Sequence, residues 1–485
     1  GHEPIDSIDL MERAASRCVD WISTRFSKDR TFRIFCGKGN NGGDGLAIDR
    51  MLVKKNYPLA IYILETGKDG TNDFEVNLGR LKDLEINIQF IHSPADFPII
   101  DPSEIVIDAL FGTGLNKPLE GTACELVKHI NHSQALVLSI DLPSGLFADV
   151  SSLGNSVIRA DHTLSFQCYK KGLLVQENGI YTGLVHLVDI GLDPGFVSVE
   201  NINTFYVVDR LAKTIYKPRN AFAHKGHYGH SLLIAGSYGK MGAALLAAKA
   251  CVRSGAGLLT AYVPACGYEI MQTSVPECMV ITDDDKNILT QLPEDIEKYS
   301  SIGIGPGIGT ADATRKLMSF IIRRYRKPLV IDADGLNCLS LQKQLLEQLP
   351  VNSILTPHPK EFDRLFGDHA NDFDRLDTAI QKSKELKVII VLKGHHSYIA
   401  TPEGNSYFNS TGNAGMANGG SGDVLTGIIT ALLAQQYQPS HAAILGVYLH
   451  GLAGDFAADA FSKEAMTPSD MIACLSNAFL QFRGR

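Results

Sequence analysis

Short apolar runs recur along this chain, and most of them end in a glycine- or aspartate-bearing loop that leads into a helix-length segment. The runs at issue are 32–36, 59–65, 86–91, 104–115, 135–146, 160–168 and 183–192 in the first half, and 231–237, 301–309, 327–339 and 387–400 in the second. Repeated strand–loop–helix units build a parallel sheet with helices on both faces, and ligands then bind at the carboxyl ends of the strands. The sequence therefore predicts an α/β fold whose loops form the sites.

The length of 485 residues exceeds what one hydrophobic core usually serves, so we expect more than one domain. Residues 197–218 have the character of a connection, because no clear strand–loop–helix unit covers them. We place the boundary near residue 205, which gives domains at 1–205 and 206–485. Each half has its own glycine loops, and two ligand sites are therefore expected.

The composition argues against some classes of binding partner and cellular location. Apolar residues make up 45% of the chain, yet no apolar run approaches the roughly 20 residues of a membrane span. A net charge of −8 without a block of Lys and Arg argues against nucleic acid or an anionic membrane as the main partner. Nine cysteines without a CxxC pair, and a start without a signal-like region, favour reduced thiols in a cytoplasmic protein.

Residues 409–434 place five glycines around a single carboxylate, Asp423, and continue into an apolar helix-length segment. Free backbone N–H groups in a first helical turn favour a phosphate or a developing anion. A carboxylate at that point is a poor phosphate ligand, so we interpret Asp423 as a general base beside an anion hole. The alternative is a tight turn with an Asp helix cap, which does not require so many glycines.

Three loops of the first half supply polar side chains at consecutive strand ends. The first holds Asn40, Asn41 and Asp44, the second holds Asp108 with 112–115, and the third holds Asp141 and Ser144. Carboxylate and amide oxygens with little basic charge nearby suit a hard cation such as K⁺, Mg²⁺ or Ca²⁺. They could equally bind ribose or amide groups of a ligand. The glycine spacing after the first strand does not match a GxGxxG dinucleotide motif.

Two further groups carry weaker signals. His224, His227 and His230 are close in sequence, but loop glycines and the lack of acidic or cysteine partners make a zinc site a poor interpretation. Lys170 and Lys171 lie between two expected strands and could each neutralise a phosphate. A solvated surface position is the default for at least one of them.

Several motifs together resemble a known family. NAGMANGGSGDVLTG, GSYGKMGAALLAA, GIGPGIG, DADGLN, TPHPKEF and LKGHHS resemble the NAD(P)HX dehydratases, a branch of the ribokinase-like fold. GKGNNGGDGLAIDRML, DALFGTGL and DLPSGL resemble the NAD(P)HX epimerase domain, which has a Rossmann-like αβα fold. Their order resembles the bifunctional NAD(P)HX repair enzymes of the YjeF family, and the match covers nearly the whole chain.

The resemblance implies two three-layer αβα domains that repair hydrated NADH or NADPH. The N-terminal domain would interconvert the R and S epimers of NAD(P)HX. The C-terminal domain would dehydrate the S form with ADP, rather than ATP, as nucleotide, releasing AMP and phosphate with the help of Mg²⁺. We expect these small molecules as partners and a homo-oligomer as the assembly.

The resemblance also implies roles for particular residues. The K⁺ ligands of the epimerase would be Asn41, Asp108 and Ser144, and the catalytic residues of the two domains would be Asp141 and Asp423. Substrate in the first domain would contact Asp141 together with Asn40, Asn41, Gly42, Gly43, Asp44, Gly112, Thr113, Gly114, Leu115, Asn116, Lys117 and Pro118. Substrate in the second would contact Ala243, Gly307, His358 and Asp423. Nucleotide would be held by Lys393, Gly394, His395, His396, Ser397, Gly419, Gly420, Ser421 and Gly422.

This chain departs from the family pattern at a few positions. Asn418 stands where many relatives have threonine, and Lys240-Met241 replaces a more usual Met-Pro. The start of the epimerase domain is shorter than in the family pattern. The backbone N–H groups of the expected anion hole are unaffected by these changes.

Two rival functions use the same features. A ribokinase-like kinase for a vitamin precursor would need the same Asp423 and glycine loop, but it would not need the fused NNGGDG domain. Alternatively, the N-terminal half could be a binding module without catalysis. Its retained Asn41, Asp108 and Asp141 count against that reading.

Overall fold

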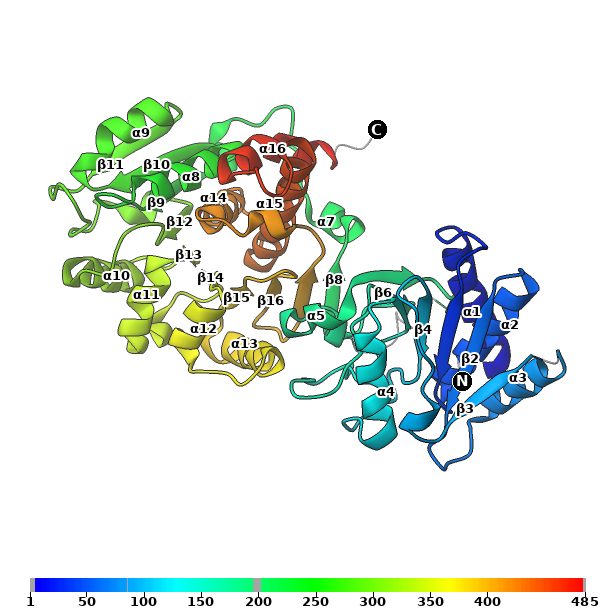
Figure 1. Cartoon of the computed structure of the whole chain (residues 1–485). Coiled ribbons are helices and arrows are strands. Elements are labelled where there is room, and N and C mark those ends of the chain that lie inside the picture. The colour runs from blue at the N-terminus through cyan, green and yellow to red at the C-terminus, as the bar shows by residue number, and fades with distance from the viewer. Residues whose placement is uncertain (1–4, 85, 194, 196–201, 483–485) are drawn as a thin grey trace. The chain divides into compact units, whose positions relative to one another are not determined.

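The computed structural model describes residues 5–84, 86–193, 195 and 202–482, and the chain divides into two compact units (Figure 1). The first unit comprises residues 1–201 with 371–373, and the second comprises 202–370 with 374–485. Both are α/β units, as predicted. No helix in the described ranges has the length and apolar character that a membrane span requires.

The stretch 197–218, expected as a connection with a boundary near 205, differs from that expectation where it is described. It holds strand β8 (Thr204–Val207) and helix α7 (Asp209–Ile215), while residues 196–201 lie outside the described part. β8 pairs with β17 (Ser406–Asn409) at the edge of the second sheet. The chain therefore enters the second unit a few residues before the expected boundary.

The first unit is built on a parallel sheet of seven strands in the order β3-β2-β1-β4-β5-β6-β7. The order changes direction between β1 and β4, and a ligand crevice is expected outside the carboxyl ends of the strands at such a point. The strands are β1 (Phe32–Cys36), β2 (Leu59–Leu64), β3 (Ile88–Ile91), β4 (Ile105–Ala109), β5 (Leu136–Ile140), β6 (His162–Phe166) and β7 (Leu184–Val188).

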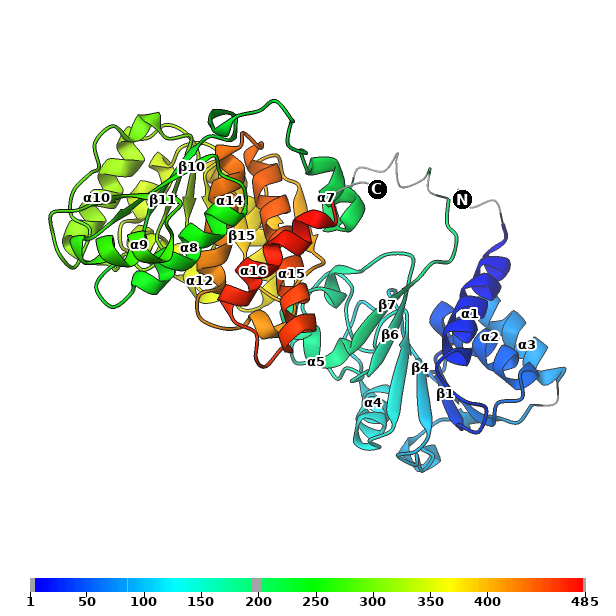
Figure 2. The same cartoon turned by 90° about the horizontal axis from the view of Figure 1, so that it is seen from above.

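Helices cover both faces of this sheet because successive strand residues point to opposite sides (Figure 2). In β1, Ile34 and Cys36 pack in one apolar cluster with α1 (Ser7–Ser23), α2 (Asn40–Lys54) and α3 (Asn72–Lys82). Phe35 packs in another cluster with α4 (Gly121–His132). The unit thus has helix, sheet and helix layers, with the short α5 (Gly179–Thr182) before β7.

The second unit contains a ten-stranded sheet in the order β11-β10-β9-β12-β13-β14-β15-β16-β17-β8. Neighbouring strands are parallel except that β16 runs antiparallel to both β15 and β17. Its remaining strands are β9 (His230–Ile234), β10 (Leu258–Val263), β11 (Cys278–Thr282), β12 (Ser301–Ile304), β13 (Leu329–Ile331), β14 (Ile354–Leu355), β15 (Ile389–Leu392) and β16 (Tyr398–Ala400).

Helix α14 (Ser421–Ala434) lies at the centre of the second unit, and every residue from Val424 to Ala434 is buried. It packs against α8 (Met241–Arg253) so closely that a Cβ on Gly427 would lie 2.2 Å from the carbonyl oxygen of Ala247. Its first turn follows the glycine-rich loop, so core packing fixes the position of that loop. The other helices are α9 (Tyr268–Ser274), α10 (Asp312–Arg324), α11 (Asp334–Leu341), α12 (Pro359–Phe366), α13 (Asp372–Leu386), α15 (Pro439–Phe461) and α16 (Pro468–Leu480).

One buried side chain in the first unit is unusual. Asp49, on α2, is fully buried, and neither of its carboxylate oxygens has a hydrogen-bond partner among the described residues. Burial raises the pKa of Asp49 well above its ordinary value. The folded state therefore favours the neutral acid, and the carboxyl group destabilises the fold increasingly as pH rises above the pKa of an unfolded aspartate, about 4.

Asp49→Asn is expected to stabilise the first unit, and by more at pH 8 than at pH 6, because the amide removes the cost of ionisation. A gain of 1 kcal/mol corresponds to about 2–4 °C in Tm for a unit of this size. Thermal unfolding followed through Trp21, the single tryptophan of the chain, reports on this unit. Asp83→Asn, at an exposed aspartate, is the matched control. A pH-independent difference between wild type and Asp49→Asn would contradict the prediction.

Candidate functional site

The first candidate site lies where the loops after β1 and β4 meet. A Cβ on Gly37 would lie 2.0 Å from the carbonyl oxygen of Leu110, and a Cβ on Gly42 would lie 1.7 Å from that of Gly37. Only glycine fits such contacts. The residues predicted to bind substrate, Asn40 to Asp44, form the first turn of α2. The first N–H groups of a helix have no intrahelical acceptor, whereas that of Gly43 already donates to the carbonyl oxygen of Gly39.

Asp108 is the buried anchor of this site. Its carboxylate accepts hydrogen bonds from Ser139 Oγ (2.8 Å), the backbone N–H of Ser144 (2.8 Å) and of Leu110 (3.3 Å), and from the Ser144 hydroxyl. Burial raises the pKa of Asp108, and the bonds from Ser144 and Ser139 oppose that rise. Ser144 Oγ also accepts from the N–H of Phe111 (2.8 Å). The structure thus joins two of the three residues predicted to bind K⁺.

Asn41, the third predicted K⁺ ligand, is 8% exposed, and its amide oxygen and nitrogen have no partner among the described residues. A Cβ on Gly112 would lie 3.3 Å from the Cβ and Cγ of Asn41 and 3.4 Å from Oδ2 of Asp141. Gly112 therefore borders both side chains. An unpartnered buried amide is costly unless a ligand or ion completes its bonds.

Asp141 directly follows β5 and has a left-handed backbone, with φ of 66°. Its carboxylate is paired with Lys170, whose Nζ lies 2.5 Å from Oδ1. Burial raises the pKa of Asp44 strongly, and the nearby charges of Asp141 and Asp73 add to that rise. The site therefore holds the carboxyl groups of Asp44 and Asp141 in addition to that of Asp108.

The rest of the loop predicted to contact substrate in the first domain, 113–118, runs along the surface between β4 and α4. Thr113, Gly114, Asn116, Lys117 and Pro118 are exposed, and Leu115 is half-buried. No side-chain hydrogen bond from these residues to Asn41, Asp108 or Asp141 is present in the described part of the chain. Their contact with substrate stays a prediction.

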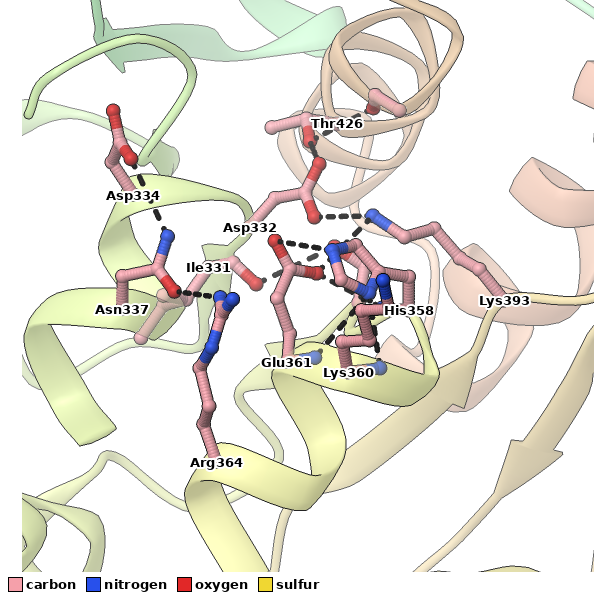
Figure 3. A network of polar contacts seen from close by, with 12 residues as sticks. Ile331, Asp332, Asp334, Asn337, His358, Lys360, Glu361, Arg364, Lys393 and Thr426 are labelled. Atoms are coloured by element: carbon pink, nitrogen blue, oxygen red, sulfur yellow. Dashed lines mark hydrogen bonds and ion pairs between the residues drawn. The ribbon is translucent and has the colours of Figure 1, made fainter. Parts of the chain in front are cut away.

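The second candidate site is organised by Asp332, which follows β13 and is 1% exposed (Figure 3). Its Oδ1 lies 2.7 Å from Lys393 Nζ, and its Oδ2 accepts a hydrogen bond from Thr426 Oγ at 2.9 Å. Lys393 follows β15, and Thr426 lies on α14. A Cβ on Gly422 would lie 3.2 Å from Lys393 Nζ, so the first turn of α14 closely adjoins this ion pair.

Asp423 lies in that first turn and lines a cavity of about 620 Å³. Burial raises the pKa of Asp423 to about 7, the charge of Asp332 adds to the rise, and Lys393 opposes it. Three other predicted residues, Ala243, Gly307 and Gly419, line the same cavity. The remaining lining residues are Gly239, Lys240, Gly242, Ala333, Asp334, Asn337 and Glu361.

The glycine-rich loop before α14 has the conformation that its composition predicts. Gly420 has φ of 101°, and a Cβ there would lie 2.5 Å from Leu246 Cδ1. The loop is tied to α15 by Asp455, whose two carboxylate oxygens accept hydrogen bonds from the N–H of Gly412 and the side-chain amide of Asn413, both at 2.9 Å. At the first residue of α14, Ser421 Oγ lies 3.2 Å from His450 Nε2, also on α15. Backbone N–H groups at the start of α14 are thus held in a fixed arrangement.

His358, predicted to contact substrate, is the N-cap of α12. Its Nδ1 accepts hydrogen bonds from the N–H groups of Lys360 (3.1 Å) and Glu361 (3.3 Å), and Glu361 accepts from the N–H of His358 (2.9 Å). Burial, then the charge of Lys393, lowers the pKa of His358. Nε2 lies 3.4 Å from Glu361 Oε1. Because Nδ1 is occupied by the two N–H groups, the predicted contact would have to use Nε2, beside that carboxylate.

The segment predicted to hold nucleotide, 393–397, connects β15 to β16. Lys393 is bound to Asp332, while Gly394 and His395 are exposed. His396 Nδ1 bonds to the carbonyl oxygen of Asn409 at 2.9 Å, and burial lowers the pKa of this imidazole to about 4. His396 is therefore neutral and fixed in the loop.

Several functional candidates were not singled out from the sequence: Asp332, Asp334, Glu361 and Thr426. Lys170, interpreted from the sequence as a possible phosphate partner, is instead paired with Asp141. The sequence did contain a signal for Asp332 and Asp334. Both lie in the motif DADGLN directly after an expected strand, which is also the pattern that singled out Asp108. The weak zinc interpretation finds no support in the described ranges, where no group of three or more His, Cys, Asp or Glu side chains could hold a metal ion.

Comparison with known proteins connects these sites to a family. The family model described as YjeF-related protein N-terminus matches residues 7–172, and the model described as NAD(P)H-hydrate dehydratase matches residues 231–477. The bifunctional NAD(P)H-hydrate repair enzyme Nnr of Moorella thermoacetica is 36% identical over 96% of this chain and 91% of its own length. The enzyme of the same name from Escherichia coli is 32% identical over 96% of this chain and 88% of its own length.

A solved structure resembles the second unit. The ADP/ATP-dependent NAD(P)H-hydrate dehydratase from Bacillus subtilis, co-crystallised with ATP and Mg²⁺, has a TM-score of 0.51 and 30% identity. It covers 58% of this chain, and all of that protein is matched. Since one family model falls in each unit and the fused relatives match nearly the whole sequence, the chain belongs to the family of bifunctional NAD(P)H-hydrate repair enzymes.

Proposed function

We propose that the first unit of this bifunctional NAD(P)HX repair enzyme interconverts R- and S-NAD(P)HX, and that the second unit dehydrates the S form with ADP, releasing AMP and phosphate. The observation that carries the proposal is Asp423, a carboxyl group with a pKa of about 7 in the wall of a 620 Å³ cavity. A group with this pKa can accept a proton near neutral pH and return it.

In the second unit, Asp423 takes the proton of the ring hydroxyl, and the hydroxyl oxygen attacks the terminal phosphorus of ADP. The bond from that phosphorus to the bridging oxygen breaks, which leaves AMP. The N–H groups at the start of α14, with Lys393, stabilise the charge that develops. The ring nitrogen lone pair then expels phosphate, and loss of a proton from the neighbouring carbon restores the double bond.

Mg²⁺ fits the chemistry of this cavity, because Glu361 places a buried carboxylate in its wall beside Lys393. When bound, the ion would neutralise phosphate charge, with Glu361 as the carboxylate that holds it. Burial raises the pKa of Glu361 above its ordinary value, and the charge of Lys393 offsets part of this rise. Lys393 would approach the same phosphates from the Asp332 side.

In the first unit, K⁺ fits the unpartnered amide oxygen of Asn41 and the oxygens of Asp108 and Ser144, because these are hard donors with a single negative charge. The hydroxyl on the hydrated carbon leaves as water after gaining one proton, driven by the ring nitrogen lone pair. Water then adds to the other face and gives up one proton. Asp141 serves this proton exchange, and only the configuration changes.

The test of the whole proposal is to incubate the chain with mixed R- and S-NADHX, Mg²⁺, K⁺ and either ADP or ATP, and to follow NADH absorbance to completion. We expect both epimers to be converted, with ADP the better nucleotide. Conversion of the S form alone would contradict the epimerase assignment and favour a binding module. A phosphorylated product without NADH would favour the ribokinase-like kinase.

Asp423→Asn is expected to slow dehydration of S-NADHX by about 10²–10⁴-fold, since an amide cannot accept the hydroxyl proton. R-to-S interconversion, measured by chromatography, should be unchanged in the same variant. In the wild type, kcat/KM of dehydration should rise with pH up to about 7 and then level off, because Asp423 must be ionised. Full dehydratase activity in the variant would refute the assigned role.

Replacing K⁺ by a large organic cation is expected to slow epimerisation, and Asn41→Ala should weaken the response to K⁺, because the amide oxygen is then missing. We expect a loss of about tenfold or more in apparent K⁺ affinity. The rate of NADH formation from pure R-NADHX, corrected for spontaneous epimerisation, measures the effect. An Asn41→Ala enzyme that still responds to K⁺ as the wild type does would argue against the ligand set.

A further inference from the structure

The Lys170 ammonium is surrounded by three oxygen acceptors. Its Nζ lies 2.5 Å from Asp141 Oδ1, 3.0 Å from Ser165 Oγ and 3.0 Å from the carbonyl oxygen of Phe166. An ammonium group has three N–H donors, so these contacts occupy all of them. The side chain is 15% exposed. Lys170 is therefore a fixed cation, with no free N–H left for a ligand.

The other oxygen of the same carboxylate is in a different situation. Oδ2 of Asp141 receives no hydrogen bond from the described residues, and it faces Gly112, which also borders the unpartnered amide of Asn41. The backbone of Asp141 is held by its own N–H, which donates to the carbonyl oxygen of Leu164 at 2.8 Å. One oxygen is thus tied to lysine, and one is turned toward the crevice.

The segment that carries Lys170 is itself fixed against the loop after β5. The N–H of Gly172 donates to the carbonyl oxygen of Ala148 at 2.7 Å, and a Cβ on Gly172 would lie 2.3 Å from the carbonyl oxygen of Phe147. Asp141 begins that same loop. The lysine and the aspartate therefore rest on two segments that are locked together, which sets their geometry before any ligand binds.

We propose that Lys170 is a positioning residue of the epimerase site: its ammonium holds Oδ1 of Asp141 and so presents Oδ2 to the hydrated ring. A second carboxyl group, Asp44, lies near enough for its charge to interact with that of Asp141. The lysine charge offsets this repulsion and holds the Asp141 carboxylate in place. The inference rests on the proposed function, because it assigns Lys170 a role through Asp141.

The first experiment compares R-NADHX epimerisation by the full-length wild type and by Lys170→Met. The readout is the NADH that the chain's own second unit forms, under conditions in which dehydration of S-NADHX is faster than epimerisation. We expect kcat to fall about 10²-fold while KM changes little, since a misplaced catalytic group typically costs this much. Lys170→Arg should recover part of the loss, because it restores the charge but not the three-acceptor geometry.

The controls separate positioning from damage. Lys171→Met changes the neighbouring lysine, whose side chain makes no hydrogen bond or ion pair with the described residues of the site, and should leave epimerisation unchanged. Dehydration of pure S-NADHX should be the same in every variant, because it takes place in the other unit. Trp21 fluorescence checks that the first unit of each variant is folded.

A double-mutant cycle with Asp141→Asn decides whether Lys170 acts through Asp141. If it does, Lys170→Met adds little to the loss already caused by Asp141→Asn, so the two losses are far from additive. Additive losses, or a Lys170→Met enzyme with wild-type kcat, would overturn the inference. Failure of the wild type to epimerise R-NADHX would instead refute the proposed function of the first unit.

Discussion

A carboxylate buried at the end of a parallel strand must find hydrogen-bond donors, and both units of this chain are arranged around that requirement. In the first unit, Asp108 receives its donors from Ser139 and Ser144, which lie on and after the neighbouring strand. In the second, Asp332 receives them from Lys393 and Thr426. The donors of Asp108 thus come from the neighbouring strand β5 and the loop after it, whereas those of Asp332 come from the end of β15, two strands away, and from helix α14.

The carboxyl groups that we propose to react, Asp423 and Asp141, have fewer hydrogen-bond donors among the described residues than Asp332 and Asp108, respectively. Asp423 lies beside the Asp332–Lys393 pair without sharing its hydrogen bonds, and burial with the neighbouring negative charge raises its pKa to about 7. Asp141 has one oxygen bound by Lys170 and the other without a protein donor among the described residues. A fully bonded carboxylate beside a partly bonded one thus recurs in both sites. It separates the group that holds the structure from the group that we propose to exchange protons.

The sequence predicted best those features that depend on residues close together along the chain. Glycine loops after apolar runs predicted the α/β class, and the convergence of parallel strand ends predicted that Asp108 and Ser144 would meet. Pairings between distant segments were harder. Asp332 lies 61 residues from Lys393 and 94 from Thr426, and no local pattern joins them. β8 was missed for the same reason, since β17, the strand with which it pairs, lies about 200 residues away. From the sequence, a solvated surface position was the default for at least one of Lys170 and Lys171, whereas the structure places three oxygen acceptors around the Lys170 ammonium group.

Helix α14 carries a consequence for how the second unit can change. The same helix forms the interior of the unit along most of its length, and its start supplies Asp423 and the N–H groups that we propose to bind an anion. Because Gly427 contacts the backbone of α8, any added side-chain volume there must move the helix and its first turn together. Selection for folding and selection for turnover therefore act on one set of residues. A substitution that repacks this core also moves the first turn with Asp423, and a substitution that moves the first turn also disturbs the packing of the core.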